Sequence, residues 1–260
     1  MNDLHVSLIQ TSLHWENRDA NLEMLSEKIS QIREHSQLIL LPEMFSTGFS
    51  MKPEKFAETM DGVTIEWMKK QAGEKSAVIC GSLMVRDGDH FYNRLIWMRP
   101  DGIAEHYDKR HLFGLGEEHE HYSKGKKRLL VELNGWRILP LVCYDLRFPA
   151  WSRNTDGYDV LIYVANWPER RVGAWKTLLE ARAIENQCYV IGVNRVGKDG
   201  NGVYHSGESS LVDPRGEIWF REGHHEHTHS FTLAYHHLNH IRESLPFLKD
   251  RDAFEFNTHD

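Results

Sequence analysis

The sequence lacks several features that mark common classes of protein. It contains only three cysteines, Cys80, Cys143 and Cys188, and no Cys-x-x-Cys pair, which argues against a disulfide framework and a thiolate zinc site. No apolar run approaches the ~18 residues of a membrane span, and the amino terminus lacks the basic start and apolar core of a secretory signal. We therefore expect a cytoplasmic protein with free thiols that does not enter a membrane.

An excess of basic residues is also missing. The chain has 31 Lys and Arg against 38 Asp and Glu, a net charge of -7, and no basic stripe that could follow a phosphate backbone. Nucleic acid is therefore not an expected partner. No Ser-, Pro- or Gly-rich linker and no repeat of fixed period interrupts the chain, so we expect a single domain over residues 1–260.

What the sequence does contain is an alternation of helix-like and strand-like segments. Leu22, Leu25 and Ile29 follow helical spacing after a capping Asn17, whereas short apolar runs such as LILL and DVLIYVAN are typical of buried strands. A Pro-Asp-Gly turn and a Pro-Arg-Gly turn predict two hairpins. The pattern predicts a layered α/β fold whose sheets are mixed.

Polar side chains follow several of the apolar runs directly. Glu43 follows LILLP, Lys109 follows IAEHYD, and Cys143 follows PLV. Because ligands collect beyond the carboxyl ends of strands in α/β sheets, these side chains could share one pocket. A glutamate there could take the thiol proton, the thiolate could attack a carbonyl carbon, and the ammonium could stabilise the oxyanion.

Each of the three residues also has a purely structural interpretation. Cys143 could be a small core residue, Glu43 could cap the segment after Pro42, and Lys109 could be a solvated loop charge. The pattern alone leaves both interpretations open, because residues so far apart in the sequence meet only if the fold brings them together.

Three segments, LILLPEMFSTGF, YDKRHLF and LVCYDLRFP, resemble in order and spacing the signature blocks of the nitrilase superfamily, the carbon-nitrogen hydrolases. Later segments, among them HSGESSLVDPRGE, are similar to its omega-amidase branch. The resemblance implies a four-layer αββα sandwich of two mixed β-sheets. It also implies hydrolysis, through a cysteine thioester and without a metal or organic cofactor, of the terminal amide of small 2-oxo dicarboxylic acid monoamides such as 2-oxoglutaramate and 2-oxosuccinamate.

The resemblance assigns roles to individual residues. Glu43 is expected to be the general base, Lys109 the oxyanion stabiliser and Cys143 the nucleophile, with the backbone N–H of Tyr144 as a second oxyanion donor. Relatives also carry a second glutamate, which falls here on Glu118, although a shift of the alignment to Glu117 or Glu120 stays open. We further expect Lys109 to lower the pKa of the Cys143 thiol, since a nearby cation favours thiolate.

The substrate-binding residues are less constrained by the sequence. A dicarboxylic monoamide keeps one carboxylate, for which Arg147 is the first candidate because it lies four residues after the nucleophile. The alternative is a structural salt bridge from Arg147 to Asp145. Arg170, Arg171 and Arg195 also follow expected strand ends, and the remaining candidates for the pocket are Phe45, Asn166 and Trp167.

Two further expectations concern partners and rival functions. The resemblance implies a homodimer, with residues 148–151 and 172–186 as candidate interface segments. Many of the 17 histidines lie in residues 224–240, where alternating His225, His227 and His229 could bind a metal ion. The rivals to the omega-amidase interpretation are a metal-binding protein without amidase activity and an amidase for another small amide, such as deaminated glutathione.

Overall fold

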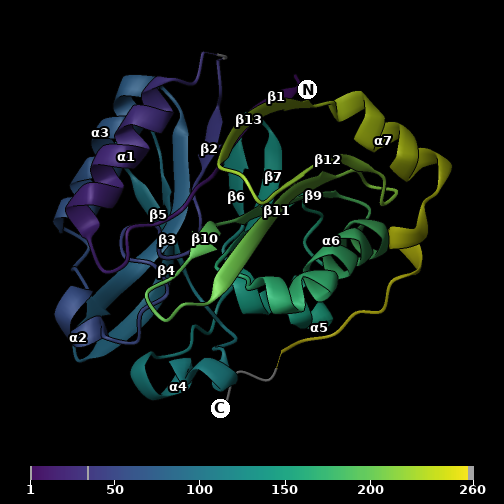
Figure 1. Cartoon of the computed structure of the whole chain (residues 1–260). Helices are drawn as coiled ribbons and strands as arrows, with labels where there is room; N and C mark the ends of the chain where they lie inside the picture. Colours follow the sequence, from purple (N-terminus) through teal and green to yellow (C-terminus); the bar gives the residue numbers. More distant parts are fainter. Residues whose placement is uncertain (1, 34, 257–260) are drawn as a thin grey trace.

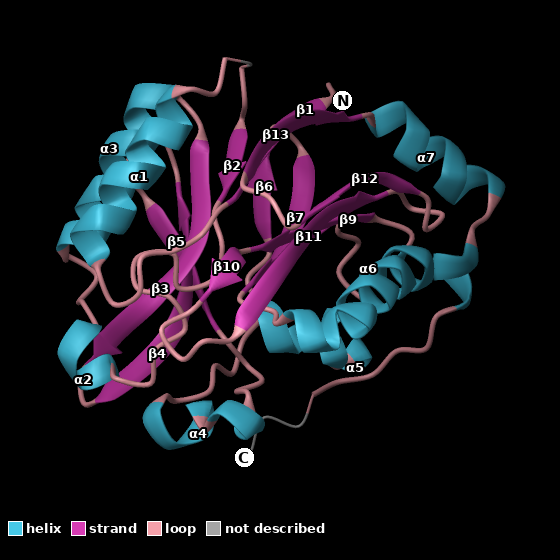
Figure 2. Cartoon of the chain, viewed as in Figure 1, coloured by secondary structure: helices cyan, strands magenta, loops and turns pink. Residues whose placement is uncertain are grey.

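The computed structural model describes residues 2–33 and 35–256, and its framework is a pair of mixed β-sheets that lie face to face (Figure 2). The first sheet has the order β13-β1-β2-β3-β4-β5. Its strands are β1 (Leu4–Gln10), β2 (Leu38–Leu40), β3 (Val78–Asp87), β4 (His90–Met98), β5 (Ala104–Asp108) and β13 (His227–Leu233). β1, β2 and β3 are parallel, and the other pairings are antiparallel.

The second sheet has the order β10-β11-β9-β8-β7-β6, and β12 also pairs with β11. Its strands are β6 (Val131–Leu133), β7 (Trp136–Val142), β8 (Val160–Ala165), β9 (Tyr189–Asn194), β10 (Val196–Lys198), β11 (Tyr204–Val212) and β12 (Ile218–Gly223). The central strands β7, β8 and β9 are parallel and fully buried apart from one position in β7. Near-continuous apolar runs are what a sheet covered on both faces requires.

Helices cover the outer face of each sheet (Figure 1). α1 (Arg18–Ser30) and α3 (Val63–Lys75) pack on the first sheet through an apolar cluster that includes Leu25, Met68 and Ile79. α6 (Val172–Asn186) lies so close to β9 of the second sheet that a Cβ at Gly192 would stand 2.7 Å from the Trp175 ring. That strand therefore needs a glycine where the helix crosses it.

The remaining helices are short or lie near the carboxyl terminus. They are α2 (Pro53–Phe56), α4 (Glu118–His121), α5 (Pro149–Ser152), α7 (Tyr235–Ser244) and the 3₁₀ turns η1 (Gly114–Gly116), η2 (Cys143–Arg147), η3 (Glu169–Arg171) and η4 (Phe247–Asp250). None of the helices in the described ranges is long and apolar enough to cross a membrane.

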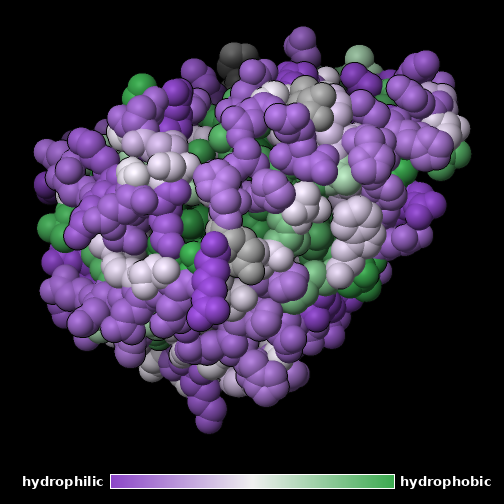
Figure 3. Space-filling model, turned by 90° about the horizontal axis from the view of Figure 1, so that it is seen from above, coloured by the Kyte–Doolittle hydropathy of each residue, from purple (hydrophilic) through white to green (hydrophobic). Residues whose placement is uncertain are grey.

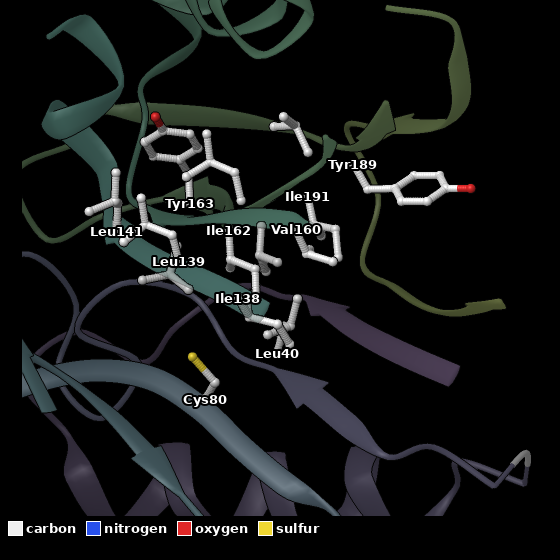
Figure 4. Packing of buried hydrophobic residues seen from close by; sticks show 14 of the residues in the cluster. Leu40, Cys80, Ile138, Leu139, Leu141, Val160, Ile162, Tyr163, Tyr189 and Ile191 are labelled. Atoms are coloured by element: carbon white, nitrogen blue, oxygen red, sulfur yellow. The ribbon is translucent and has the colours of Figure 1, made fainter. Parts of the chain in front are cut away.

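The two sheets share one apolar core between them. Leu40 and Cys80 of the first sheet belong to the same buried cluster as Ile138 and Ile162 of the second, and Figure 4 shows these side chains between the two layers. With helices outside and sheets inside, the expected αββα sandwich is confirmed. The outer surface is mostly hydrophilic in the view of Figure 3, as a fold that turns its apolar strand faces inward requires.

Both predicted hairpins are present, as β4–β5 and β11–β12, and the helical spacing of Leu22, Leu25 and Ile29 falls within α1, with Asn17 as its N-cap. β6 begins only at Val131, although the apolar run of this segment starts at Leu129. The reason lies in Arg128, whose guanidinium bonds the Trp151 and Arg153 carbonyls and pairs with Asp156, so that the preceding chain leaves the sheet.

Candidate active site

The two sheets bring four side chains together that are far apart in the sequence. Glu43 follows β2, Lys109 follows β5 and Glu118 begins α4, whereas Cys143 follows β7 of the second sheet and opens η2. All four line or lie against one cavity, and all are buried, with Cys143 the most exposed at 9%. The interpretations of Glu43 as a cap and of Lys109 as a solvated charge are therefore wrong.

Lys109 lies between two carboxylates. Its Nζ donates to Glu43 Oε1 at 2.8 Å and to both oxygens of Glu118, at 3.0 and 2.9 Å. Glu118 Oε2 also accepts the backbone N–H of Phe113 at 2.6 Å. Burial alone would lower the pKa of Lys109, but Glu118 and Glu43 outweigh it and raise that pKa, so the ammonium keeps its charge.

The second glutamate is Glu118 and neither of its neighbours. Glu118 is fully buried against Lys109, whereas Glu117 and Glu120 are exposed. Glu117 has a positive φ of 59°, which ends η1 and turns the next residue inward at the start of α4. The backbone thus resolves an ambiguity that the sequence left between three carboxylates.

The turn of residues 142–147, named the nucleophile turn after the role expected for Cys143, presents that residue in a strained backbone conformation. Cys143 has φ 42°, in the left-handed region that a residue with a side chain adopts rarely. Asp145, fully buried, holds the turn: its Oδ2 accepts the Val142 N–H at 3.1 Å and the Tyr107 hydroxyl at 2.7 Å. Its Oδ1 accepts the backbone N–H of His111 at 3.0 Å. Asp145 therefore joins the turn to the loop that follows Lys109.

The charge state of the thiol differs from the expectation. Burial raises the pKa of Cys143 well above its ordinary value, and Glu43, which is hydrogen-bonded to the thiol, raises it further, whereas Lys109 lowers it. The expected lowering by Lys109 is present, but burial and Glu43 outweigh it, so that the net shift is upward. The Cys143 thiol therefore holds its proton more tightly than an ordinary cysteine, with the Glu43 side chain within hydrogen-bonding reach.

Sequence reasoning missed Asn93, which lies on β4 between the two carboxylates. Its Nδ2 donates to Glu43 Oε1 at 2.8 Å and to Glu118 Oε1 at 3.1 Å, and its side chain is fully buried. The one signal in the sequence is a polar residue within the apolar strand HFYNRLIWM. No spacing rule marks such a position, because its partners come from other elements.

Asn166 and Trp167 both line the cavity, as expected, and Asn166 also forms hydrogen bonds to Glu43. Its backbone N–H donates to Glu43 Oε2 at 2.7 Å, and its Nδ2 donates to the Glu43 carbonyl. Asn166 Oδ1 is buried, and within residues 2–33 and 35–256 it has no hydrogen-bond partner. An acceptor is thus left beside the cavity.

Three arginines line the same cavity, which has a volume of about 160 Å³. The guanidinium of Arg147 lies 4.9 Å from the Trp167 ring centroid and that of Arg171 lies 4.8 Å from the Phe113 centroid. Neither these two nor Arg170 forms an ion pair with another described residue. The alternative of an Arg147 salt bridge to Asp145 is therefore wrong.

Two other candidates lie away from the cavity. Phe45 is fully buried in the cluster of the first sheet, with its ring 5.7 Å from that of Trp67, and the cavity is lined instead by Phe49. The expectation for Phe45 is corrected accordingly. Arg195 is buried and donates to the backbone carbonyls of Val196 and Lys198, so its guanidinium is engaged in the loop that holds it.

The histidines of residues 224–240 are arranged mainly around aromatic rings. His229 stacks on Phe220 with centroids 3.9 Å apart, and His227 lies 5.5 Å from His229. His237 pairs with Asp213 at 3.0 Å. No group of three or more His, Cys, Asp or Glu side chains within the described ranges is placed to hold a metal ion.

Comparisons with known proteins agree with this geometry. The family model described as carbon-nitrogen hydrolase matches residues 5–239. The omega-amidase YafV of Escherichia coli strain K12 is 44% identical over 98% of this chain and 99% of its own. The 2-oxoglutaramate amidase of Bacillus subtilis is 32% identical over 94% of this chain and 96% of its own.

A solved structure resembles the whole chain closely. XC1258 of Xanthomonas campestris, described as a CN-hydrolase superfamily protein with an arsenic adduct in its active site, is 42% identical. It covers 99% of this chain and 100% of its own, with a TM-score of 0.97. Nit3 of Saccharomyces cerevisiae, at 25% identity and a TM-score of 0.87, covers 96% of this chain and 97% of its own.

Proposed function

The chain belongs to the carbon-nitrogen hydrolase family and hydrolyses amide C–N bonds, and we propose that its substrates are small 2-oxo dicarboxylic acid monoamides such as 2-oxoglutaramate and 2-oxosuccinamate. The observation that carries the proposal is a thiol, a carboxylate and a buried ammonium in one cavity whose wall holds three arginines free of carboxylate partners among the described residues. The thiol, the carboxylate and the ammonium supply the groups for amide hydrolysis. The arginines supply a site for the carboxylate that such a substrate keeps.

In the proposed reaction Glu43 takes the proton of Cys143 as the sulfur attacks the amide carbon. A C–S bond forms, and the carbonyl electron pair moves to oxygen, which Lys109 Nζ and the backbone N–H of Tyr144 stabilise. Tyr144 is the second residue of η2, so its N–H has no acceptor within that turn. Protonated Glu43 then gives its proton to the nitrogen, the C–N bond breaks, and ammonia leaves a thioester.

The second half of the reaction restores the enzyme. Glu43 takes a proton from water, whose oxygen attacks the thioester carbon. The C–S bond then breaks, and Glu43 returns that proton to the sulfur, which gives the acid and the thiol. Because Glu43 acts first as a base and then as an acid in each half of the reaction, it must be held in place throughout. The bonds from Lys109 and from the Asn166 N–H to its carboxylate supply that restraint.

The carboxylate of the substrate is assigned to Arg147 and Arg171, with the Trp167 ring against the substrate chain. Asn166 Oδ1, which lacks a partner among the described residues, is suited to accept an N–H of the reacting amide. The cavity volume of about 160 Å³ favours small amides, since the pockets that bind drug-sized ligands have volumes of about 300–1,000 Å³. That volume disfavours deaminated glutathione, the larger of the candidate substrates.

The test is ammonia release from a panel of amides by the wild type and by Cys143→Ala. We expect release from 2-oxoglutaramate and 2-oxosuccinamate, and much slower release from an aliphatic amide of equal length that lacks the carboxylate. Arg147→Met and Arg171→Met should raise KM for the oxo-amides and leave the rate on the aliphatic amide unchanged. Equal rates on charged and neutral amides would overturn the substrate assignment, and release from none of them would overturn the proposal.

We also propose a single domain that pairs as a homodimer and works in the reducing cytoplasm. The core shared by the two sheets supports one domain, and the three unpaired cysteines suit a reducing compartment. Ile184 on α6 is 54% exposed, which supports pairing through that helix, whereas Trp151 in the other candidate segment is already covered by Phe256. Sedimentation at equilibrium distinguishes a dimer from a monomer.

A further inference from the structure

Two carboxylates lie beside a single ammonium in the buried centre of the active site. Glu43 and Glu118 are each fully buried, and both bond Lys109 Nζ. If both are ionised, the three groups carry one uncompensated negative charge. Two carboxylates in one buried site normally share a proton, because the first ionisation opposes the second. A proton on Glu43 would leave it unable to accept one from Cys143.

Asn93 supplies the N–H groups that oppose this outcome. One amide nitrogen donates to Glu43 Oε1 at 2.8 Å and to Glu118 Oε1 at 3.1 Å. A hydrogen bond donated to a carboxylate favours its ionised form. The Asn93 carbonyl also accepts the backbone N–H of Lys109 at 3.0 Å, which fixes the two residues side by side. One residue thus contacts all three charged members of the site.

The orientation of the Asn93 amide follows from its surroundings. In the structure the amide nitrogen faces the two carboxylates, whereas a flipped amide would set its oxygen against their oxygens. Asn93 Oδ1 is then buried without a hydrogen-bond partner in the described part of the chain. An unsatisfied buried oxygen destabilises the fold, so packing alone does not account for an asparagine at this position of β4.

We propose that Asn93 is a positioning residue that keeps Glu43 and Glu118 apart and both ionised, so that Glu43 is ready to accept the thiol proton. This inference rests on the amide hydrolysis proposed above. Asn93 does not line the cavity, so it acts through the glutamates and not on the substrate.

The other titratable groups that face the two glutamates do not replace this function. Lys109 is shared between both carboxylates, and Cys143 is the proton donor. The remaining neighbour, Tyr122, donates its hydroxyl to the Ser50 carbonyl at 2.7 Å, and burial raises its pKa, so it stays neutral. The backbone N–H of Asn166 donates to Glu43 alone and that of Phe113 to Glu118 alone, so Asn93 is the neutral donor that both carboxylates share.

The experiment is the pH profile of kcat/KM for ammonia release by the wild type, Asn93→Asp and Asn93→Ala. Asp keeps the shape but adds a carboxylate, and Ala removes the donor. The acidic limb of the profile reports the essential base of the free enzyme. We expect it to move upward by about one pH unit or more in both variants, further in Asn93→Asp, with kcat reduced at pH 7 and KM little changed.

The matched control is Asn154→Ala. Asn154 is also a fully buried asparagine, but its amide bonds the backbone of Tyr158 and Asn186, away from the carboxylates. This variant should melt at a lower temperature and keep the wild-type acidic limb. Asn93→Ser, which retains a small hydroxyl donor, should show a smaller displacement and serves if the other Asn93 variants do not fold.

The possible results distinguish a failure of the role proposed for Asn93 from a failure of the proposed amide hydrolysis. An acidic limb that stays in place in the folded Asn93 variants, with kcat lowered by the same factor at every pH, would show a packing role only and overturn the inference. A wild type that releases no ammonia from any amide would instead overturn the proposed function. A displaced limb in the Asn93 variants with an unmoved limb in Asn154→Ala supports the inference.

Discussion

Cys80 and Cys143 belong to opposite sheets and show how little burial alone says about a cysteine. Both follow apolar strand residues, and burial raises the pKa of both thiols. Cys80 lies in the regular ladder of β3, between Leu40 and Trp97 on the neighbouring strands, within the core between the sheets. It is a core residue, as its sequence context predicts.

Cys143 differs in its backbone and its partners. It has left the ladder of β7 with φ 42°, and the Glu43 and Lys109 side chains beside it come from the loops of the opposite sheet. The comparison teaches that the surroundings, and not a low pKa at rest, distinguish the proposed nucleophile. Glu43 hydrogen-bonded to the thiol provides a route for its proton, which Cys80 in its apolar surroundings lacks.

The largest expected effect follows from removing each thiol in turn. Cys143→Ala should lower ammonia release by roughly 10⁴-fold or more, the order of loss seen when a catalytic nucleophile is removed. Cys80→Ala and Cys188→Ala should keep nearly the wild-type kcat, because both side chains are fully buried in the core and neither lines the cavity. Near-normal turnover by Cys143→Ala would remove the distinction between the cysteines.

The elements around both cysteines could be predicted from the sequence, because strand and helix signals are local. Apolar runs bounded by turn residues predict β3 and β7, and helical spacing predicts α1. The Glu, Lys and Cys blocks also marked Glu43, Lys109 and Cys143 correctly as residues that meet. Their convergence could not be derived from spacing, since it depends on how the two sheets stack.

The wrong or missing predictions share one physical cause. Each concerns a property that depends on contacts with residues from distant segments of the chain. The net pKa of Cys143 depends on burial, Glu43 and Lys109 together, and the sequence suggests only the lysine. Phe45 follows a strand as a pocket residue could, but its ring packs against Trp67 of α3. Asn93 was missed because its two glutamate partners lie on other elements.

An intermediate effect is expected from loosening the nucleophile turn without touching the thiol. In Asp145→Asn an NH₂ group replaces one oxygen and faces donors that now lack an acceptor, such as the Val142 N–H or the His111 N–H. Leaving a buried donor unsatisfied costs about 1–3 kcal/mol. If this free-energy cost displaces Cys143 from its reactive position, kcat should drop roughly 10- to 100-fold.

The control for that variant is Asp159→Asn. Asp159 is also buried and accepts a backbone N–H, from Arg137 at 3.0 Å, and it pairs with Arg242 away from the cavity. It should lower the melting temperature and leave kcat unchanged. If both variants reduce kcat equally, Asp145 contributes only to general stability, and the contrast between the nucleophile turn and an ordinary strand end disappears.

The smallest effect concerns the pH dependence of alkylation by iodoacetamide, followed by mass spectrometry. Since the pKa of Cys143 is raised, its thiolate fraction should grow about tenfold per pH unit between pH 7 and 9 without a plateau, whereas a thiolate held by Lys109 would plateau near neutral pH.

Cys80 should stay unlabelled while the protein is folded. A thiol whose pKa is raised on folding stabilises the native state below the ordinary value of 9.0, and that stabilisation is lost as the pH rises further. Labelling of Cys80 should therefore begin only at strongly alkaline pH, with unfolding, and labelling of Cys80 at the rate of Cys143 at pH 8 would contradict the comparison.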